Sequence, residues 1–372
     1  MAFETQTSVV LPRGRVVRSG AAAPIWAWEM EGPPGAPTLL LLHGWMATAA
    51  LNWYAALPYL SRQFRLVAPN LRGHGREGCG APPFSLDSCS DDLAALIGEL
   101  RLQGAIAVGY SMGGAVAQVM ARRHREVLGG IVLCATGASF ARRVKLRPLV
   151  RATGKAISGT ARRHPAEAAA FLRWRLARHD RLAAARSAHA AARAAGVAGG
   201  VAGVAGVAGV AGVAGVAGVA AMSSFPAAAA KVADGAEPGP EAGAGKAARA
   251  GSWAGTVRAW AMEERQFSHL AAFVEAGAEL NAYDSSRWLP TLDVPAAVVV
   301  TARDRIVAPW RQDAMAALIH GARRYSVDAG HDAVAASPEL FLPVLARACS
   351  ELARASRSVA GVGGAGSGGV AP

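Results

Sequence analysis

Cysteine is scarce and unpatterned in this chain, which has four among 372 residues: Cys79, Cys89, Cys134 and Cys349. No two of them form a C-x-x-C pair, and their spacings make no disulfide framework, so we interpret them as reduced thiols. The N-terminal segment also lacks the apolar block of about 7–15 residues that a secretory signal carries after its charges. Both absences favour a cytoplasmic protein.

Signatures of metal and nucleotide binding are absent as well. Histidines and acids never gather in the sequence at the spacing of a metal site. The glycine-rich stretch GYSMGG, residues 109–114, matches neither the G-x-G-x-x-G of a dinucleotide site nor the G-K-[ST] of a phosphate loop. We therefore expect no cofactor and no metal.

Acidic residues are few, since 26 Asp and Glu stand against 39 Lys and Arg, a formal net charge of +13. Almost the whole excess lies in residues 141–193, where fourteen basic residues face only Glu167 and Asp180. A solvated helix surface is one interpretation of this segment, and an anionic substrate or peripheral contact with an anionic membrane is another. No nucleic-acid-binding motif accompanies the charge, so we expect no nucleic-acid partner.

Short apolar runs alternate with helical patterns in the first 136 residues and again after residue 285. The runs predict strands at 38–44, 64–70, 105–110, 129–136 and 294–304, and we expect a further strand, ending in a turn, at 322–332. The helical patterns fall at 51–62, 85–102, 112–126, 309–321 and 337–353. This order is typical of an α/β protein with a mostly parallel sheet and helices on both faces. We predict one sheet domain built from residues 1–136 and 286–355, followed by a disordered tail at 356–372.

The segment 137–285 interrupts this alternation. It carries a tandem VAG repeat at 196–221 and an Ala/Gly/Pro-rich stretch at 222–250, and a helical pattern returns at 253–281. Glycine at every third position disfavours a helix and adds little hydrophobicity, so we expect a low-complexity loop there rather than a membrane span. The stretch that follows the repeat is expected to be a disordered linker.

Ser111 lies where a strand pattern gives way to a helix pattern, between Gly109 and Gly113. Glycines at these positions allow a strained turn and close helix packing, which is typical of a G-x-S-x-G nucleophile elbow. The motif alone is weak, because a chain with 43 glycines can contain it by chance. The backbone N–H of Met112 would be one donor to a developing oxyanion.

Three further groups of residues complete the same chemistry. After the strand at 38–44, His43 and Gly44 turn the chain, so that the backbone N–H of Trp45 becomes the second oxyanion donor. Asp304 ends the strand at 294–304 and is the candidate acid, and His331 follows the last strand and is the candidate base. The other histidines fit turn, packing or surface positions, and three other acids are less suitably placed: Asp293, Asp328 and Asp332.

Five segments occur along both halves of the sheet domain, in an order that is highly specific: LLLLHGW, VAPNLRGHG, AVGYSMGGAVAQ, VVVTARDRIVAP and DAGHDAV. With them the chain resembles the α/β-hydrolase superfamily, in its branch of esterases, lactonases and C–C hydrolases, and also a group of uncharacterised actinobacterial hydrolases. The resemblance implies a catalytic triad of Ser111, Asp304 and His331, and it makes residues 137–285 a helical cap that shapes the substrate pocket. Asn70 departs from the Asp that relatives commonly have there, at a position that is usually structural.

The triad predicts a serine hydrolase that cleaves an ester, lactone or thioester of a small hydrophobic acyl substrate through an acyl-enzyme. Two alternatives use the same residues, C–C bond hydrolysis and cofactor-free perhydrolysis, since a fold does not fix a substrate. An alternative of another class is a ligand-binding or membrane-surface module with negligible turnover.

Overall fold

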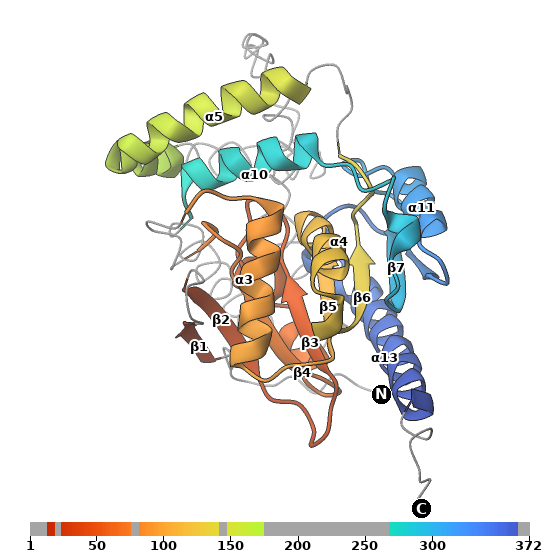
Figure 1. Cartoon of the computed structure of the whole chain (residues 1–372). Helices are drawn as coiled ribbons and strands as arrows, with labels where there is room; N and C mark the ends of the chain where they lie inside the picture. The colour runs from red at the N-terminus through yellow and green to blue at the C-terminus, as the bar shows by residue number, and fades with distance from the viewer. Residues whose placement is uncertain (1–12, 19–23, 76–81, 141–146, 175–267, 364–372) are drawn as a thin grey trace, which may run out of the picture.

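The computed structural model describes residues 13–18, 24–75, 82–140, 147–174 and 268–363. The VAG repeat and the linker predicted after it lie outside the described residues. The described part forms one eight-stranded sheet with helices packed on it, and two further helices lie across one end of the sheet (Figure 1).

The sheet is mostly parallel. Its strands are β1 (Arg13–Val17), β2 (Ile25–Met30), β3 (Thr38–Leu42), β4 (Arg65–Pro69), β5 (Ala105–Tyr110), β6 (Leu128–Cys134), β7 (Ala296–Thr301) and β8 (Arg323–Val327). Their spatial order is β1-β2-β4-β3-β5-β6-β7-β8. Strand β2 runs antiparallel to both β1 and β4, and all other neighbours are parallel. The predicted α/β class is confirmed, and the sequence patterns missed only the β1–β2 hairpin at one edge.

Both faces of the inner parallel strands β3, β5 and β7 are buried, which explains why these strands read as continuous apolar runs. In β3, Leu40 and Leu42 belong to the core cluster that includes residues of α3 (Leu86–Glu99) and α4 (Met112–Arg123). Leu39 and Leu41 belong to the cluster on the other face, with residues of α13 (Pro338–Gly363). Full burial of each such leucine contributes about 1.5–3 kcal/mol.

Two helix predictions need correction. The helix expected at 51–62 is two short ones, α1 (Ala49–Trp53) and α2 (Leu57–Leu60), because Pro58 stands in the first turn of the second and suits a helix start. Helix α13 continues to Gly363, past the predicted start of a disordered tail at 356. The residues just after 355 include neither glycine nor proline, and extending an existing helix costs little. The remaining helices of the sheet domain are α11 (Pro309–Leu318) and α12 (Ala333–Ala336).

Helices α5 (Arg147–Arg163) and α10 (Leu270–Ala282) come from the segment predicted to be a cap. Figure 1 shows α10 across the end of the sheet toward which β3 and β6 point, with α5 packed on α10. The two ends of the segment meet, because Ser139 and Asp284 form an antiparallel bridge and the Ser285 N–H donates to the Ala138 carbonyl at 2.8 Å.

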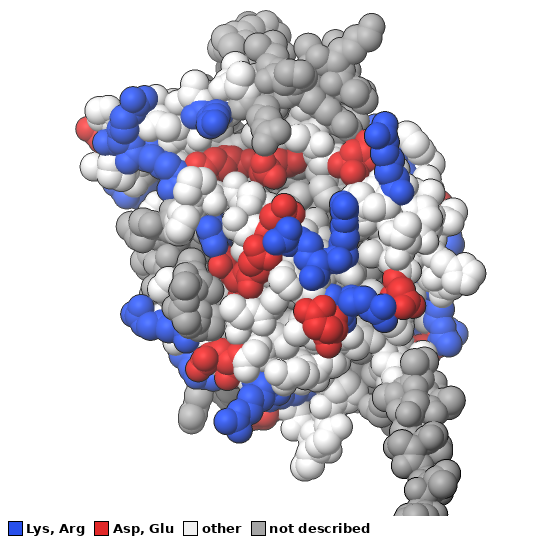
Figure 2. Space-filling view, in the orientation of Figure 1, with Lys and Arg blue, Asp and Glu red and all other residues white. Residues whose placement is uncertain are grey.

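Opposite charges join the two cap helices. Figure 2 shows basic side chains of α5 beside a row of acidic side chains along α10. Arg162 Nε lies 2.7 Å from Glu275 Oε1, so part of the basic excess of the cap is neutralised within it. No helix in the described part of the chain is both long and apolar enough to cross a membrane.

Candidate active site

Ser111 occupies the sharp turn between β5 and α4. Its backbone has φ 52° and ψ −111°, a conformation that is costly for a residue with a side chain and is concentrated at functional sites. The turn is this tight because Gly109 and Gly113 have no side chains. A Cβ at Gly109 would lie 2.3 Å from the Gly113 carbonyl oxygen, and one at Gly113 would lie 2.2 Å from the Leu42 carbonyl oxygen. The predicted strand–turn–helix setting of Ser111 is therefore what the structure has.

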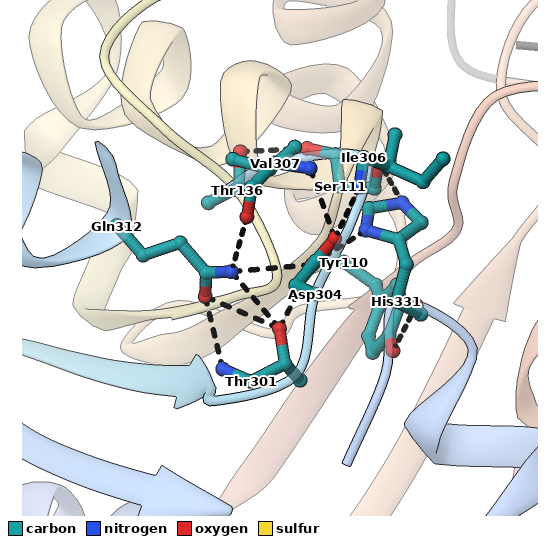
Figure 3. A network of polar contacts seen from close by, with 9 residues as sticks. All are labelled: Tyr110, Ser111, Thr136, Thr301, Asp304, Ile306, Val307, Gln312 and His331. Atoms are coloured by element: carbon teal, nitrogen blue, oxygen red, sulfur yellow. Dashed lines mark hydrogen bonds and ion pairs between the residues drawn. The ribbon is translucent and has the colours of Figure 1, made fainter. Parts of the chain in front are cut away.

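The structure brings Ser111, His331 and Asp304 together, although they lie far apart in the sequence (Figure 3). His331 Nε2 is 3.0 Å from Ser111 Oγ, and His331 Nδ1 is 2.8 Å from Asp304 Oδ2. Because a carboxylate accepts, Nδ1 carries the proton and Nε2 is left as the acceptor for the serine hydroxyl. The Asp304 side chain is fully buried and that of His331 is partly exposed, so only the base end of the pair is accessible.

The Asp304 carboxylate is held by four donors besides His331. Oδ1 accepts from the backbone N–H groups of Ile306 at 2.8 Å and Val307 at 2.9 Å. Oδ2 accepts from the Thr301 hydroxyl at 2.9 Å and from Gln312 Nε2 at 3.1 Å. These bonds fix the carboxylate toward the imidazole and satisfy a buried charge, which would otherwise be costly.

Tyr110 and Thr136 donate hydrogen bonds to the backbone of the base and of the nucleophile. The Tyr110 hydroxyl donates to the His331 carbonyl at 2.6 Å, which ties the strand before the nucleophile to the loop that carries the base. The Thr136 hydroxyl donates to the Ser111 carbonyl at 2.8 Å. Burial raises the pKa of Tyr110 well above its usual range, so its hydroxyl remains a donor at any working pH. No sequence motif signals Thr301, Gln312, Tyr110 or Thr136, and sequence reasoning missed all four.

The loop after β3 lies against the serine, since a Cβ at Gly44 would lie 3.6 Å from Ser111 Cβ. The Leu71 N–H donates to His43 Nε2 at 2.9 Å, so the proton of His43 is on Nδ1, which donates to the Gly44 carbonyl at 2.8 Å. That bond sets the plane of the Gly44–Trp45 peptide, and its N–H points away from its carbonyl. Burial lowers the pKa of His43 to about 3, so this imidazole is neutral over the ordinary pH range.

Other contacts keep the rest of this loop in place. The Gly44 N–H donates to Asn52 Oδ1 at 3.0 Å, and the Ala49 N–H donates to Asn70 Oδ1 at 2.9 Å. Among the described residues, no partner accepts the backbone N–H of Trp45 or of Met112. Both remain available to a ligand beside Ser111, as the sequence predicts for an oxyanion hole.

Several of the competing acids and histidines have other partners. Asp293 pairs with Arg125 at 2.8 Å, and Asp328 pairs with Arg303 at 3.0 Å. His124 lies 2.7 Å from Asp91 on the surface. His74 is buried beneath the cap, next to His43.

Comparisons with known proteins identify what the chain is similar to. Residues 37–207 match the family model described as "alpha/beta hydrolase fold". The chain is 38% identical over 104 residues to a bifunctional esterase/perhydrolase of Acinetobacter calcoaceticus, covering 27% of this chain and 37% of that protein. It is 39% identical over 107 residues to a pimeloyl-[acyl-carrier protein] methyl ester esterase of Aromatoleum aromaticum, covering 29% and 40%. The chain thus spans about two fifths of the length of these curated relatives.

Solved structures share the fold of this chain. An esterase from Exiguobacterium antarcticum superposes with a TM-score of 0.57 at 15% identity, covering 91% of this chain and 99% of that one. An enol-lactonase from Burkholderia xenovorans superposes with a TM-score of 0.54 at 17% identity, covering 90% and 100%. At such identities the likeness concerns the fold alone.

Proposed function

The chain belongs to the α/β-hydrolase superfamily, and from this premise we propose that it is a serine hydrolase acting on carboxylic esters or closely related acyl bonds. The single observation that carries the proposal is the unbroken hydrogen-bonded series from Asp304 through His331 to Ser111. Each of the three residues follows the carboxyl end of a parallel strand, where α/β proteins bind their ligands.

The proposed reaction follows from the protonation states given by the geometry. As Ser111 Oγ attacks the carbonyl carbon, its proton passes to His331 Nε2 and the carbonyl electron pair moves to oxygen. The N–H groups of Trp45 and Met112 stabilise that oxyanion. Collapse expels the alcohol, which takes the proton from His331, and a water molecule then repeats the cycle on the acyl-enzyme to release the acid.

Asp304 has two roles in this scheme. It holds His331 in the tautomer whose Nε2 accepts, and its negative charge stabilises the imidazolium formed in each half-reaction. Its donors Thr301, Gln312 and the two backbone N–H groups hold the carboxylate in place beside His331 throughout the reaction.

We propose a small hydrophobic acyl substrate carrying an ester, lactone or thioester. Two of the relatives carry names that include esterase, and one name also includes perhydrolase, so cofactor-free perhydrolysis is a second candidate for the same three residues. C–C bond hydrolysis is a third. A series of esters, thioesters and lactones of increasing acyl length, assayed with the purified protein, shows which of these three acyl bonds the protein cleaves and which acyl length it prefers.

The decisive test is the substitution Ser111→Ala. We expect hydrolysis of p-nitrophenyl esters to fall by about 10⁶-fold, to the background rate, because the nucleophile is gone. Ser326→Ala, on the exposed side of β8, is the matched control and should leave the rate unchanged. A fluorophosphonate should label the parent protein at Ser111 and leave the Ser111→Ala variant unlabelled.

The same labelling experiment separates the proposal from the alternative of a binding module with negligible turnover. An inert serine would react with neither the ester nor the fluorophosphonate, and that result would refute the hydrolase. Peripheral association of the basic cap with an anionic membrane remains a prediction. Its supporting observation is the exposure of Ile157 and Phe171, both about half accessible, among the basic residues of the cap.

A further inference from the structure

Helix α10 of the cap touches the loop of the proposed oxyanion hole at the side chain of Trp45. The indole Nε1–H donates to the carbonyl oxygen of Phe273 at 2.8 Å. A Cβ at Gly277 would lie 2.8 Å from Trp45 Cζ2, so the ring rests on the bare backbone of α10 at that position. Residues 273 and 277 are about one helical turn apart, so both contacts of the indole are with a single turn of α10.

Gly277 is otherwise difficult to explain. Glycine is the least favourable residue inside a helix after proline, and α10 runs unbroken from Leu270 to Ala282. The space that a side chain would take at 277 is filled by the Trp45 ring. The contact between the loop and the cap thus accounts for a residue that the helix alone would not favour.

Helix α10 is itself firmly held, so it can fix what it touches. The His269 N–H donates to the Gly73 carbonyl at 3.1 Å, which joins the start of α10 to the turn after β4. Glu275 accepts from the Phe84 N–H at 2.8 Å and pairs with Arg162 of α5. These bonds anchor α10 to the sheet domain on one side and to the rest of the cap on the other.

The loop needs such an anchor between Gly44 and Ala47. Trp45 has no hydrogen bond through its backbone N–H to any described residue, and Met46 has φ 60°, a left-handed conformation that is costly with a side chain. The one backbone bond across this turn runs from the Ala47 N–H to the Gly44 carbonyl and is long, at 3.3 Å. The indole is therefore the principal fixed point of residues 45 and 46.

We propose that Trp45 is a positioning residue through which α10 holds the oxyanion loop, so that the cap sets the rate of acyl transfer as well as the shape of the pocket. The proposal rests on the serine-hydrolase function proposed above. Its chemical content is that the indole–Phe273 bond keeps the Trp45 N–H aimed beside Ser111, where the tetrahedral oxyanion develops.

The first test is Trp45→Phe, which keeps an aromatic ring and removes only the indole donor. We expect kcat for p-nitrophenyl acetate to fall about tenfold with KM within about twofold, a fraction of the ~10²–10³ lost when an oxyanion donor is removed outright. The pH profile of kcat/KM should not move, because the triad is untouched. The matched control is Trp310→Phe at an indole that is 66% exposed, and it should behave like the parent. A parent-like kcat in Trp45→Phe would overturn the proposal.

The second test measures hydrogen–deuterium exchange in the loop and does not rely on activity. In Gly277→Ala the new methyl displaces the ring, so backbone amides of residues 43–50 should exchange with deuterium about tenfold faster than in the parent. Gly159→Ala is the control, since nothing lies within 4 Å of a Cβ at that glycine of α5, and its exchange should match the parent. Unchanged exchange in Gly277→Ala would also overturn the proposal.

The two proposals fail separately. Absence of fluorophosphonate labelling in the parent protein would remove the hydrolase function, and the exchange experiment would still decide whether α10 holds the loop. Labelling of the parent together with parent-like kinetics and exchange in both variants would leave the hydrolase standing and refute the role of Trp45.

Discussion

Tyr110 shows at the scale of one residue how the base is kept in line with the nucleophile. Its hydroxyl donates a hydrogen bond to the backbone carbonyl of His331. The imidazole of His331 in turn contacts the hydroxyl of Ser111, which is the residue that follows Tyr110 in the chain. The ring is buried edge-on against Trp53 and Phe341, so the hydroxyl has little freedom to move away. The hydrogen bond therefore sets the position of the imidazole loop relative to the turn.

We expect Tyr110→Phe to lower kcat about 5- to 10-fold, because the His331 loop loses a hydrogen bond that contributes about 1 kcal/mol. Tyr325→Phe is the matched control, since it removes a hydroxyl that donates to Glu351, away from Ser111. Steady-state kinetics and urea unfolding of both variants check this. Both variants should lose a comparable amount of stability, and only Tyr110→Phe should lose kcat. Equal kcat values in the two variants would contradict the role of Tyr110 in positioning the His331 loop.

The residues of the candidate triad could be predicted because their types and chain order are distinctive and each follows a readable strand. Their supports could not. Gln312 reaches Asp304 from a different element, α11, and a glutamine in a helix is most often solvated, so nothing in one sequence distinguishes it. Only the packing of α11 on β7 brings the two together.

Close packing between β5 and α4 is the element-scale condition for the turn at Ser111. The two elements approach until a methyl group at Gly109 would overlap backbone atoms of Gly113 and Gly114. Backbone atoms cannot rotate aside as a side chain can, so the glycine is required by contact. This condition was predictable from the motif, whereas the β1–β2 hairpin was not, because an antiparallel edge pair gives a weaker pattern than a buried parallel strand.

We expect Gly109→Ala to lower the free energy of unfolding by about 1–3 kcal/mol or more through overpacking, and to abolish esterase activity with it. Gly98→Ala in α3 is the control, because nothing lies within 4 Å of a Cβ there and alanine should stabilise the helix by about 0.5–1 kcal/mol. Urea unfolding followed by circular dichroism measures both. A stable, active Gly109→Ala protein would show that the turn can open.

At the scale of the whole molecule, the sheet domain and the cap meet over a pair of buried histidines. The ring centroids of His43 and His74 are 5.4 Å apart, and that of His74 is 5.0 Å from that of Phe273 on α10. His74 Nδ1 lies 3.0 Å from the Arg72 carbonyl, and its Nε2 has no hydrogen-bond partner among the described residues. Sequence patterns placed both histidines in turns but could not place the cap above them, because that contact joins segments some 200 residues apart.

This arrangement predicts that the whole fold loses stability in mild acid. Burial lowers the pKa of His74 to about 4 and that of His43 to about 3, against about 6.5 in the unfolded chain. Between pH 6.5 and 4 the unfolded state therefore binds more protons, and each histidine removes about 1.4 kcal/mol of stability per pH unit as the pH falls. Above pH 6.5 both are neutral in either state and contribute no slope.

The prediction is checked by urea unfolding at several pH values between 7 and 4.5, for the parent and for His74→Asn. Asparagine can still donate to the Arg72 carbonyl but does not titrate, so the variant should lose about 1.4 kcal/mol per pH unit less than the parent over this range. Other titrating groups cancel in the difference between the two proteins. His320→Asn, at an exposed histidine, should keep the parent slope. Parallel curves for the parent and His74→Asn would mean that His74 takes up its proton without opening the contact between the cap and the sheet.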